Sequence, residues 1–445
     1  MYFFYRILTA VGMLVLAPYF FLRGWRRGRP ASTFWERMGG VPREIAARAR
    51  ATERGAIWIH AVSVGEVLAA KPLLEGLKRD NPARLVFVST TTDTGQALAR
   101  ERLSNADGIF YFPLDWVVAV RRALRAIRPA AVIVMETEIW PNFLREAHRG
   151  GIPVIFANAR ISEKSFARFK KWEWLIGPMF RRTIEDATMF LTQSPEDSAR
   201  LVAMGAEEDQ VLVTGNLKYD ASPASSGDFA KWLGAEIERQ ERWPVLVAGS
   251  VVAGEEEAVL GAYDTVQRQW RRTLLILAPR KPDRFDFAVR LVAEGGWNVI
   301  RRSALDLSAP LDESADVLIL DSIGELAALY SLADATFVGG SLVPSGGHNI
   351  LEPAQFGRPP VFGPHMENFK QMADAFLNAK AGAQVTSGNA LGTVWMQLIQ
   401  NNEMREHVGA AAKALAERNR GATERTLEKI ESILAHTLSA KDSHR

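Results

Sequence analysis

The stretch from Ala56 to Glu66, AIWIHAVSVGE, contains the structural pattern that the rest of the chain repeats. Its first four residues are uniformly apolar, and a Ser-x-Gly turn then leads into a segment of helical character, residues 66–78. A short run that is apolar throughout is typical of a strand buried on both faces, as in a parallel sheet covered by helices. The stretch therefore predicts a strand, a polar loop and the start of a helix.

Similar apolar runs alternate with helix-like segments on both sides of a Ser/Pro/Gly-rich segment, residues 221–227 (ASPASSG), which predicts a linker. The expected strands are Ala56–Ile59, Leu85–Thr90, Ala131–Met135, Val154–Ala157, Met189–Thr192 and Val211–Thr214, then Val245–Ala248, Thr273–Ala278, Asn298–Ile300, Val317–Leu320, Ala335–Gly339 and Pro359–Phe362. This alternation predicts an α/β doubly wound fold with two Rossmann-like halves. We expect an N-terminal segment at 1–29, a first domain at 30–222, and a second domain at 223–445 that ends in a helical tail.

The charge of the chain is concentrated at one end. The 445 residues carry a net charge of +3, yet the first thirty contain five arginines and no acid, which leaves 49 basic and 51 acidic residues elsewhere. A basic body that binds nucleic acid is therefore not expected. Cysteine is absent, which excludes disulfides, thiolate metal sites and a cysteine nucleophile.

An uncharged stretch, Ile7–Leu22, has aromatic residues at both edges and is followed by Arg23, Arg26, Arg27 and Arg29. About 17–20 apolar residues suffice to span a bilayer, and a following basic cluster predicts that the rest of the chain stays in the cytoplasm. A cleavable signal peptide would carry its basic residues before the apolar run and a small-residue site after it. The stretch predicts a membrane anchor with a basic collar, and a buried or interfacial helix is the alternative.

Polar side chains follow the expected strands of the first half. Glu66 stands three residues after Ser63, which fits either a capping box or a catalytic carboxylate. Glu136 and Glu138 follow the strand 131–135 beside a tryptophan, and carboxylates there are costly to bury without partners. Cations, Arg160 and Lys218, follow two later strands. A hydroxyl-rich loop, residues 89–95 (STTTDTG), could bind phosphate or sugar hydroxyls or merely cap a helix.

The second half carries candidates for binding an anion and a ribose. Arg280 follows an apolar strand and could pair with a phosphate. The segment 339–353, GGSLVPSGGHNILEP, predicts a strand end, a glycine-rich loop and a helix that Asn349 would cap, with Glu352 able to accept hydrogen bonds from ribose hydroxyls. It lacks the P-loop lysine and the dinucleotide spacing. No histidine pair has the spacing of a zinc site, so no metal is expected.

Several strings together resemble the 3-deoxy-D-manno-octulosonic acid (Kdo) transferases of Gram-negative bacteria. They are IHAVSVGEVLAAKPL, METEIWPN, NARIS, VTGNLKYD, APRKPDRF, IGELAALY and VGGSLVPSGGHNILEPA. The resemblance covers most of the chain, from about Trp35 to about Phe369, together with the N-terminal anchor. It implies a GT-B glycosyltransferase at the cytoplasmic side of the inner membrane. Such an enzyme moves Kdo from CMP-Kdo to the lipid A precursor, lipid IVA, and inverts the anomeric centre without a metal or other cofactor.

The resemblance also implies residue roles. Glu66 matches the proton acceptor, and Glu136 and Lys218 match positions that stabilise the transition state. The positions that match CMP-contacting segments are Pro279, Arg280, Ile323, Gly324, Glu325, Asn349, Ile350, Leu351 and Glu352. One segment departs from the pattern: the residues 250–255 read SVVAGE, where many relatives carry a Thr-His-Glu-Gly-Glu-like string. The expected partners are CMP-Kdo, the lipid A precursor and inner-membrane lipids, and no nucleic acid.

Two other functions remain compatible with this sequence. A nucleotide-sugar epimerase or hydrolase shares the GT-B fold, but it would not need a hydrophobic anchor. A non-catalytic membrane scaffold would tolerate loss of the carboxylates, whereas Glu66, Glu136 and Glu352 are all present.

Overall fold

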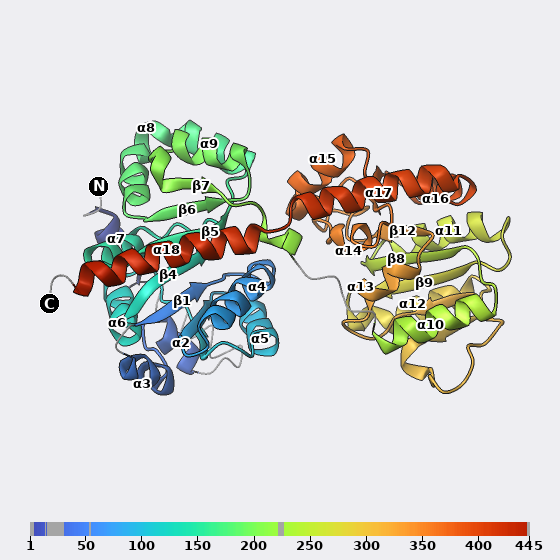
Figure 1. Ribbon diagram of the computed structural model, residues 1–445, viewed down its shortest axis with the longest axis horizontal. Helices are drawn as coiled ribbons and strands as arrows, with labels where there is room; N and C mark the ends of the chain where they lie inside the picture. The colour runs from blue at the N-terminus through green and yellow to red at the C-terminus, as the bar shows by residue number, and fades with distance from the viewer. Residues whose placement is uncertain (1–3, 14, 16–30, 53–54, 221–226, 443–445) are drawn as a thin grey trace. The chain divides into compact units, whose positions relative to one another are not determined.

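The computed structural model describes residues 4–13, 15, 31–52, 55–220 and 227–442, without the side chains of residues 31, 32 and 437–442. Residues 221–226 of the expected linker, and residues 1–3, 14 and 16–29 of the expected anchor and basic collar, lie outside these residues. The chain forms two compact units, Met1–Ala221 with Asn419–Arg445, and Ser222–Arg418. Each is a separate α/β body built around its own sheet (Figure 1).

The first unit has a seven-stranded sheet of order β3-β2-β1-β4-β5-β6-β7, and every neighbouring pair is parallel. Its strands are β1 Ala56–His60, β2 Val86–Thr90, β3 Gly108–Tyr111, β4 Pro129–Met135, β5 Val154–Ala159, β6 Met189–Thr192 and β7 Val211–Val213. Its helices are α2 Ala31–Arg37, α3 Arg43–Ala51, α4 Val64–Asp80, α5 Asp93–Arg102, α6 Val117–Ile127, α7 Pro141–Arg149, α8 Glu163–Glu185, α9 Pro195–Ala203 and α18 Ala422–Asp442, with 3₁₀ turns η1 Glu208–Gln210 and η2 Leu217–Asp220. The strand order reverses between β1 and β4, which is where doubly wound sheets bind ligands.

Side chains of one strand enter two separate cores, because successive residues of a strand point to opposite faces. Trp58 of β1 packs in the core beneath α3, α6, α7, α8 and α9. Ile57 and Ile59 pack in the core beneath α4, α5 and α18. Burial on both faces explains why the strands read as uninterrupted apolar runs.

The second unit has a seven-stranded parallel sheet of order β10-β11-β9-β8-β12-β13-β14. Its strands are β8 Val245–Val251, β9 Leu274–Pro279, β10 Val299–Arg301, β11 Val317–Ile319, β12 Ala335–Val338, β13 Val361–Phe362 and β14 Ala383–Gln384. Its helices are α10 Asp228–Arg239, α11 Glu256–Gln267, α12 Phe285–Glu294, α13 Leu326–Leu329, α14 Leu351–Ala354, α15 Lys370–Asn378, α16 Gly388–Gln400 and α17 Asn402–Arg418, with 3₁₀ turns η3 Pro282–Arg284, η4 Arg302–Ala304, η5 Tyr330–Leu332 and η6 Glu367–Phe369. Here the order reverses between β8 and β12.

The C-terminal helix α18 belongs to the first unit, whereas the sequence pattern assigned it to the tail of the second domain (Figure 1). Its apolar residues Leu427 and Ile430 are buried in the core that also holds β1 and α4. Gly76 of α4 admits Leu427, since a Cβ at that glycine would lie 2.2 Å from the leucine Cδ1. Charged residues such as Glu424, Arg425 and Glu428 lie on the exposed face of α18, so composition alone gave no sign of which sheet the helix covers.

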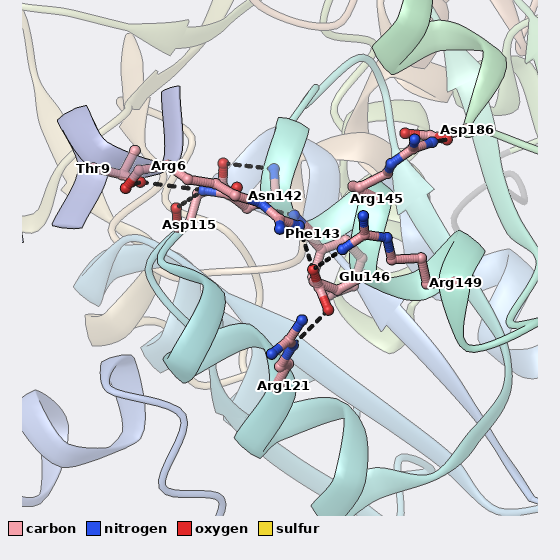
Figure 2. A network of polar contacts seen from close by, with 10 residues as sticks. All are labelled: Arg6, Thr9, Asp115, Arg121, Asn142, Phe143, Arg145, Glu146, Arg149 and Asp186. Atoms are coloured by element: carbon pink, nitrogen blue, oxygen red, sulfur yellow. Dashed lines mark hydrogen bonds and ion pairs between the residues drawn. The ribbon is translucent and has the colours of Figure 1, made fainter. Parts of the chain in front are cut away.

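Residues 4–13 form a helix that polar contacts hold to the first unit (Figure 2). The contacts join Tyr5 to Asp115 at 2.8 Å, Thr9 to Asn142 at 3.3 Å, and Arg6 to Glu146. On the other side of this helix, Phe4, Leu8 and Val11 are 74%, 70% and 52% exposed. The polar side chains of the helix therefore face the protein while an apolar stripe faces outward. Within the described residues, no helix is both long and apolar enough to cross a membrane.

We expect Ile430→Ala to lower the free energy of unfolding of the first unit by about 2–5 kcal/mol, because it leaves a cavity between α18 and the sheet. Glu428→Ala, an exposed change on the same helix, should stay within about 0.5 kcal/mol of the wild type. Urea unfolding followed by circular dichroism measures both. An unchanged transition in Ile430→Ala would mean that α18 does not stabilise the unit.

Candidate functional site

Glu66 lies in the first turn of α4, directly after β1 and its loop. Its carboxylate accepts hydrogen bonds from the Val62 N–H at 2.8 Å and from the Ser63 hydroxyl at 2.9 Å. Ser63 is the N-cap residue, yet its side chain accepts no hydrogen bond from the helix. The capping box that the spacing allowed is therefore not formed, because the serine hydroxyl donates to Glu66 instead.

The environment of Glu66 adjusts its acidity. The residue is only 6% exposed, and this burial is the main cause that raises its pKa to about 7. The hydrogen bonds from Val62 and Ser63 act in the opposite direction, and the charges of Glu136 and Glu138 raise the pKa further. A carboxyl with a pKa near neutrality can exchange a proton at physiological pH, as a general base must.

Glu136 follows β4, the strand on the other side of the point where the strand order reverses. Its φ of +54° is left-handed, which is uncommon for a residue with a side chain. The Nζ of Lys218 lies 3.8 Å from its Oε1. Burial and the nearby Glu136 raise the pKa of Glu138. The structure thus brings Glu66, Glu136, Glu138 and Lys218 into one electrostatically coupled group at the carboxyl edge of the sheet.

Asn158 connects this group to the turn η2. It also has a left-handed φ, +58°, and its Oδ1 accepts a hydrogen bond from the Leu217 N–H at 3.0 Å. Lys218 is the next residue, and its own N–H donates to Asn216 Oδ1. Asn158 therefore fixes the backbone that carries Lys218, and the local signal for this role was its place directly after the apolar run 154–157, near the end of β5.

The hydroxyl-rich loop after β2 caps the next helix. Thr92 is the N-cap of α5 and accepts a hydrogen bond from the Gly95 N–H at 3.0 Å. Its hydroxyl also donates to the Val62 carbonyl at 3.0 Å. Of the two interpretations of this loop, helix capping is confirmed, and the cap also braces the loop that leads to Glu66.

In the second unit the structure brings Arg280, His348 and Glu352 together. Burial raises the pKa of Glu352 to about 7, and the charge of Arg280 and a hydrogen bond with Asn349 act against that rise. Burial and the same arginine lower the pKa of His348 to about 4. Arg280 follows Pro279, the last residue of β9, and its N–H donates to the Val251 carbonyl at 2.8 Å. The cation is thereby held beside the end of β8.

The segment 321–325 presents its backbone rather than its carboxylate. Gly324 has a φ of +96°, and Ile323 is exposed. The carboxylate of Glu325 is engaged by Arg302, 3.0 Å away, and by the Ser322 hydroxyl. Sequence reasoning missed Arg302, which comes from a different strand end and carries no motif of its own.

The helix that Asn349 was expected to cap is a single turn, α14, and its N-cap is Ile350. Asn349 Oδ1 accepts a hydrogen bond from the Leu351 N–H at 3.2 Å, which is a local turn. Pro353 has no N–H to donate, and the chain turns away at Gly357, where φ is +67°. The predicted helix after the glycine-rich loop is therefore present, but it is a single turn, and the prediction that Asn349 is its N-cap is wrong.

Within the ranges that the structure describes, no group of three or more histidine, aspartate or glutamate side chains is placed to hold a metal ion. The charged groups at the carboxyl edge of each sheet combine carboxylates with a cation: Lys218 beside Glu136 in the first unit, and Arg280 near Glu352 in the second. Such groups suit proton transfer and the binding of anions.

Two doubly wound parallel units in one chain define the GT-B class of fold. A crystal structure of a putative UDP-N-acetylglucosamine 2-epimerase from Listeria monocytogenes has this fold with a TM-score of 0.56, at 13% identity, covering 87% of this chain and 98% of that chain. At such identity the likeness concerns the fold alone.

The sequence comparisons identify the family. Residues 32–221 match the family model of 3-deoxy-D-manno-octulosonic-acid transferase (kdotransferase). The transferase of Bordetella pertussis is 34% identical over 94% of this chain and 97% of its own length, and that of Haemophilus influenzae is 32% identical over 85% and 87%. The chain belongs to the 3-deoxy-D-manno-octulosonic acid transferase family. It is a Kdo transferase, and this decides against the epimerase, hydrolase and scaffold alternatives.

We expect Asn158→Gly to lower activity by about tenfold. Glycine keeps the left-handed backbone but removes the acceptor that holds η2 and Lys218. The loss of one hydrogen bond, about 1 kcal/mol, corresponds to a rate change of roughly this order. Asn158→Ala should lose about 1–2 kcal/mol more stability, because alanine is strained at positive φ. Steady-state kinetics and urea unfolding measure the two effects. Wild-type activity in Asn158→Gly would show that Asn158 does not position Lys218.

Proposed function

We propose that this enzyme transfers Kdo from CMP-Kdo to a hydroxyl of the lipid A precursor, lipid IVA, with inversion and with Glu66 as the general base. The observation that carries the proposal is the buried carboxyl of Glu66, with a pKa of about 7, at the strand-order reversal of the first unit. The carboxylate takes the proton of the acceptor hydroxyl as its oxygen bonds to the anomeric carbon of Kdo. The bond from that carbon to the phosphate oxygen of CMP breaks, and CMP leaves with the electron pair.

Glu136 and Lys218 are assigned to stabilisation of the transition state. Their support is the 3.8 Å approach of the two charges and the left-handed backbone at Glu136. Residues in sparsely populated backbone conformations cost about 1–3 kcal/mol and persist where surrounding structure compels them, often at functional sites. The like charge of Glu136 also helps to raise the pKa of Glu66, so Glu136 tunes the base as well.

The CMP moiety is assigned to the second unit. Arg280 supplies positive charge for the phosphate, and Glu352 accepts hydrogen bonds from the ribose hydroxyls. The remaining contacts are assigned to the residues that match the family's nucleotide segments, Pro279, Ile323, Gly324, Glu325, Asn349, Ile350 and Leu351. Because cations and backbone N–H groups stabilise the departing phosphate in this scheme, the transfer needs no metal ion.

We further propose that residues 1–29 anchor the enzyme to the cytoplasmic face of the inner membrane. The basic collar suits anionic headgroups, and the outward stripe of Phe4, Leu8 and Val11 suits the apolar boundary of a bilayer. Contacts to Asp115, Asn142 and Glu146 support this arrangement, since they hold the opposite side of the helix to the first unit; those of Thr9 and Arg6 are drawn in Figure 2.

A second exposed apolar surface supports the same placement. Trp172, Leu175 and Ile176 of α8 are all exposed and, at i, i+3 and i+4, lie on one face of the helix, with Lys170 and Lys171 directly before Trp172 in the chain. Tryptophan and lysine together are typical of contacts at the interface between headgroups and acyl chains. Helix α8 packs against α7, the helix that also holds the N-terminal segment.

We expect kcat/KM of the wild type to rise tenfold per pH unit below about 7 and to level off above it, because Glu66 must be deprotonated to act as a base. Glu66→Gln should lose at least a hundredfold in kcat and with it this pH dependence. The assay combines freshly generated CMP-Kdo with lipid IVA. Glu75→Gln, an exposed change on the same helix, is the matched control. Equal activity of Glu66→Gln and the control would remove Glu66 from its role.

Binding to lipid vesicles tests the membrane proposal. The double variant Leu8→Ser/Val11→Ser should weaken binding to phosphatidylglycerol-containing vesicles at least tenfold, since each buried apolar side chain contributes about 1.5–3 kcal/mol. Met404→Ser removes a partly exposed apolar residue from α17 and should leave binding unchanged. Co-sedimentation measures the affinity, and equal binding of all three proteins would contradict a role for the stripe.

A further inference from the structure

Glu255 is a fully buried carboxylate that binds four backbone N–H groups. It is the last residue of the segment 250–255, which differs from the string that many relatives carry, and it lies between β8 and α11. Its Oε1 accepts from Ser341 and Leu342, both at 2.8 Å, and its Oε2 accepts from Gly340 at 2.7 Å and from Val252 at 3.0 Å. A carboxylate has about four acceptor positions, so these donors satisfy it completely without a cation.

The turn that Glu255 holds is the first part of the glycine-rich loop. The Gly340 carbonyl accepts a hydrogen bond from the Gly347 N–H at 2.7 Å, which closes the loop on itself. Gly340 has a φ of +68°, and a Cβ there would lie 2.7 Å from the Cδ2 of His348. The conformation of residues 340–342 is therefore transmitted to residues 347 and 348, one residue before Asn349.

The same carboxylate decides which donors of the loop remain for a ligand. The N–H groups of Gly340, Ser341 and Leu342 are occupied, and that of Gly347 is bound within the loop. An anion at this edge must therefore be bound by later groups of the loop or by Arg280. Glu255 acts on the ligand site through the loop rather than by contact.

The neighbouring Glu256 plays a similar part near the other segment assigned to CMP, which contains Pro279 and Arg280. Its carboxylate pairs with Arg284 at 2.7 Å, four residues after Arg280. The Gly254 N–H donates to the same side chain at 2.9 Å. Glu255, the last residue of the segment 250–255, and Glu256, the residue after it, thus hold both loops through two buried carboxylates.

We propose that Glu255 is a positioning residue for the donor: it sets the turn 339–342 and through it the placement of residues 346–352 against the nucleotide. This inference rests on the proposed assignment of CMP to the second unit. Glu255→Gln keeps the shape of the side chain but turns an N–H₂ group toward N–H donors, so at least one of the four hydrogen bonds becomes a repulsive contact. A misplaced loop weakens donor binding without touching the acceptor or Glu66.

The test measures CMP affinity by calorimetry, together with kcat and the two KM values, on the full-length enzyme. For Glu255→Gln we expect the Kd of CMP and the KM of CMP-Kdo to rise at least tenfold, with the KM of lipid IVA unchanged. Glu255→Asp keeps the charge but retracts it by one methylene, so we expect an intermediate rise. If the glutamine variant does not fold, the aspartate variant carries the test.

The matched control is Asp334→Asn. Asp334 accepts the Val245 N–H at 2.8 Å, at the start of β8, so it binds a backbone N–H at the opposite edge of the same sheet. It should lower thermal stability and leave CMP affinity intact. Wild-type CMP affinity in both Glu255 variants, or an equal loss of affinity in Asp334→Asn, would overturn the positioning role. Arg280→Ala tests the assignment of CMP to the second unit separately from the role of Glu255. If this variant binds CMP as the wild type does, the proposed CMP site is wrong, whatever the Glu255 variants show.

Discussion

Burial of both faces of two parallel sheets is the constraint on which the rest of this structure depends. A parallel strand must return through a crossover on one face, so helices cover each sheet and the strands become apolar throughout. Charged side chains then lie mainly in the loops at the strand ends. Glu66 and Glu136 lie at the carboxyl ends of β1 and β4, and Arg280 lies at the end of β9. Charged side chains gather at these edges because the covered faces of a sheet do not tolerate unpaired charge.

Glu66 and Glu255 show how the number of hydrogen-bond donors around a buried carboxylate affects its properties. Glu66 receives one N–H and one hydroxyl and faces two like charges, so burial prevails and its pKa rises to about 7. Glu255 receives four N–H groups and serves as a fixed point for the backbone around it. The carboxylate of Glu66 is left partly unsatisfied by hydrogen bonds, whereas that of Glu255 is fully satisfied. That difference follows from the number of hydrogen bonds that each carboxylate accepts.

Most of the core strands could be predicted from the sequence, because a short apolar run bounded by turn residues is typical of a strand covered on both faces. The run Ala131–Met135 corresponds to β4, although the strand begins two residues earlier at Pro129. The edge strands β3 and β14 were missed, since Gly108–Tyr111 and Ala383–Gln384 are short and half exposed. Glu66 could be found from its place after a strand. Its spacing from Ser63 could not show whether the serine hydroxyl accepts a hydrogen bond from the helix, as in a capping box, or donates one to the Glu66 carboxylate, as the structure shows. Contacts between segments far apart, such as Glu255 with residues 340–342, leave no local pattern.

The N-terminal helix shows why charge counted along a sequence does not say where that charge acts. Arg6 was counted with the positive end of the chain, yet it pairs with Glu146, which also binds Arg121 and Arg149 (Figure 2). Burial raises the pKa of Glu146, but these arginines outweigh it and the net effect is a lowered pKa. The carboxylate therefore remains charged through the physiological range, and the contact persists wherever the enzyme works. The charge of Arg6 therefore acts in a contact within the first unit, on the side of the helix opposite the exposed Phe4, Leu8 and Val11.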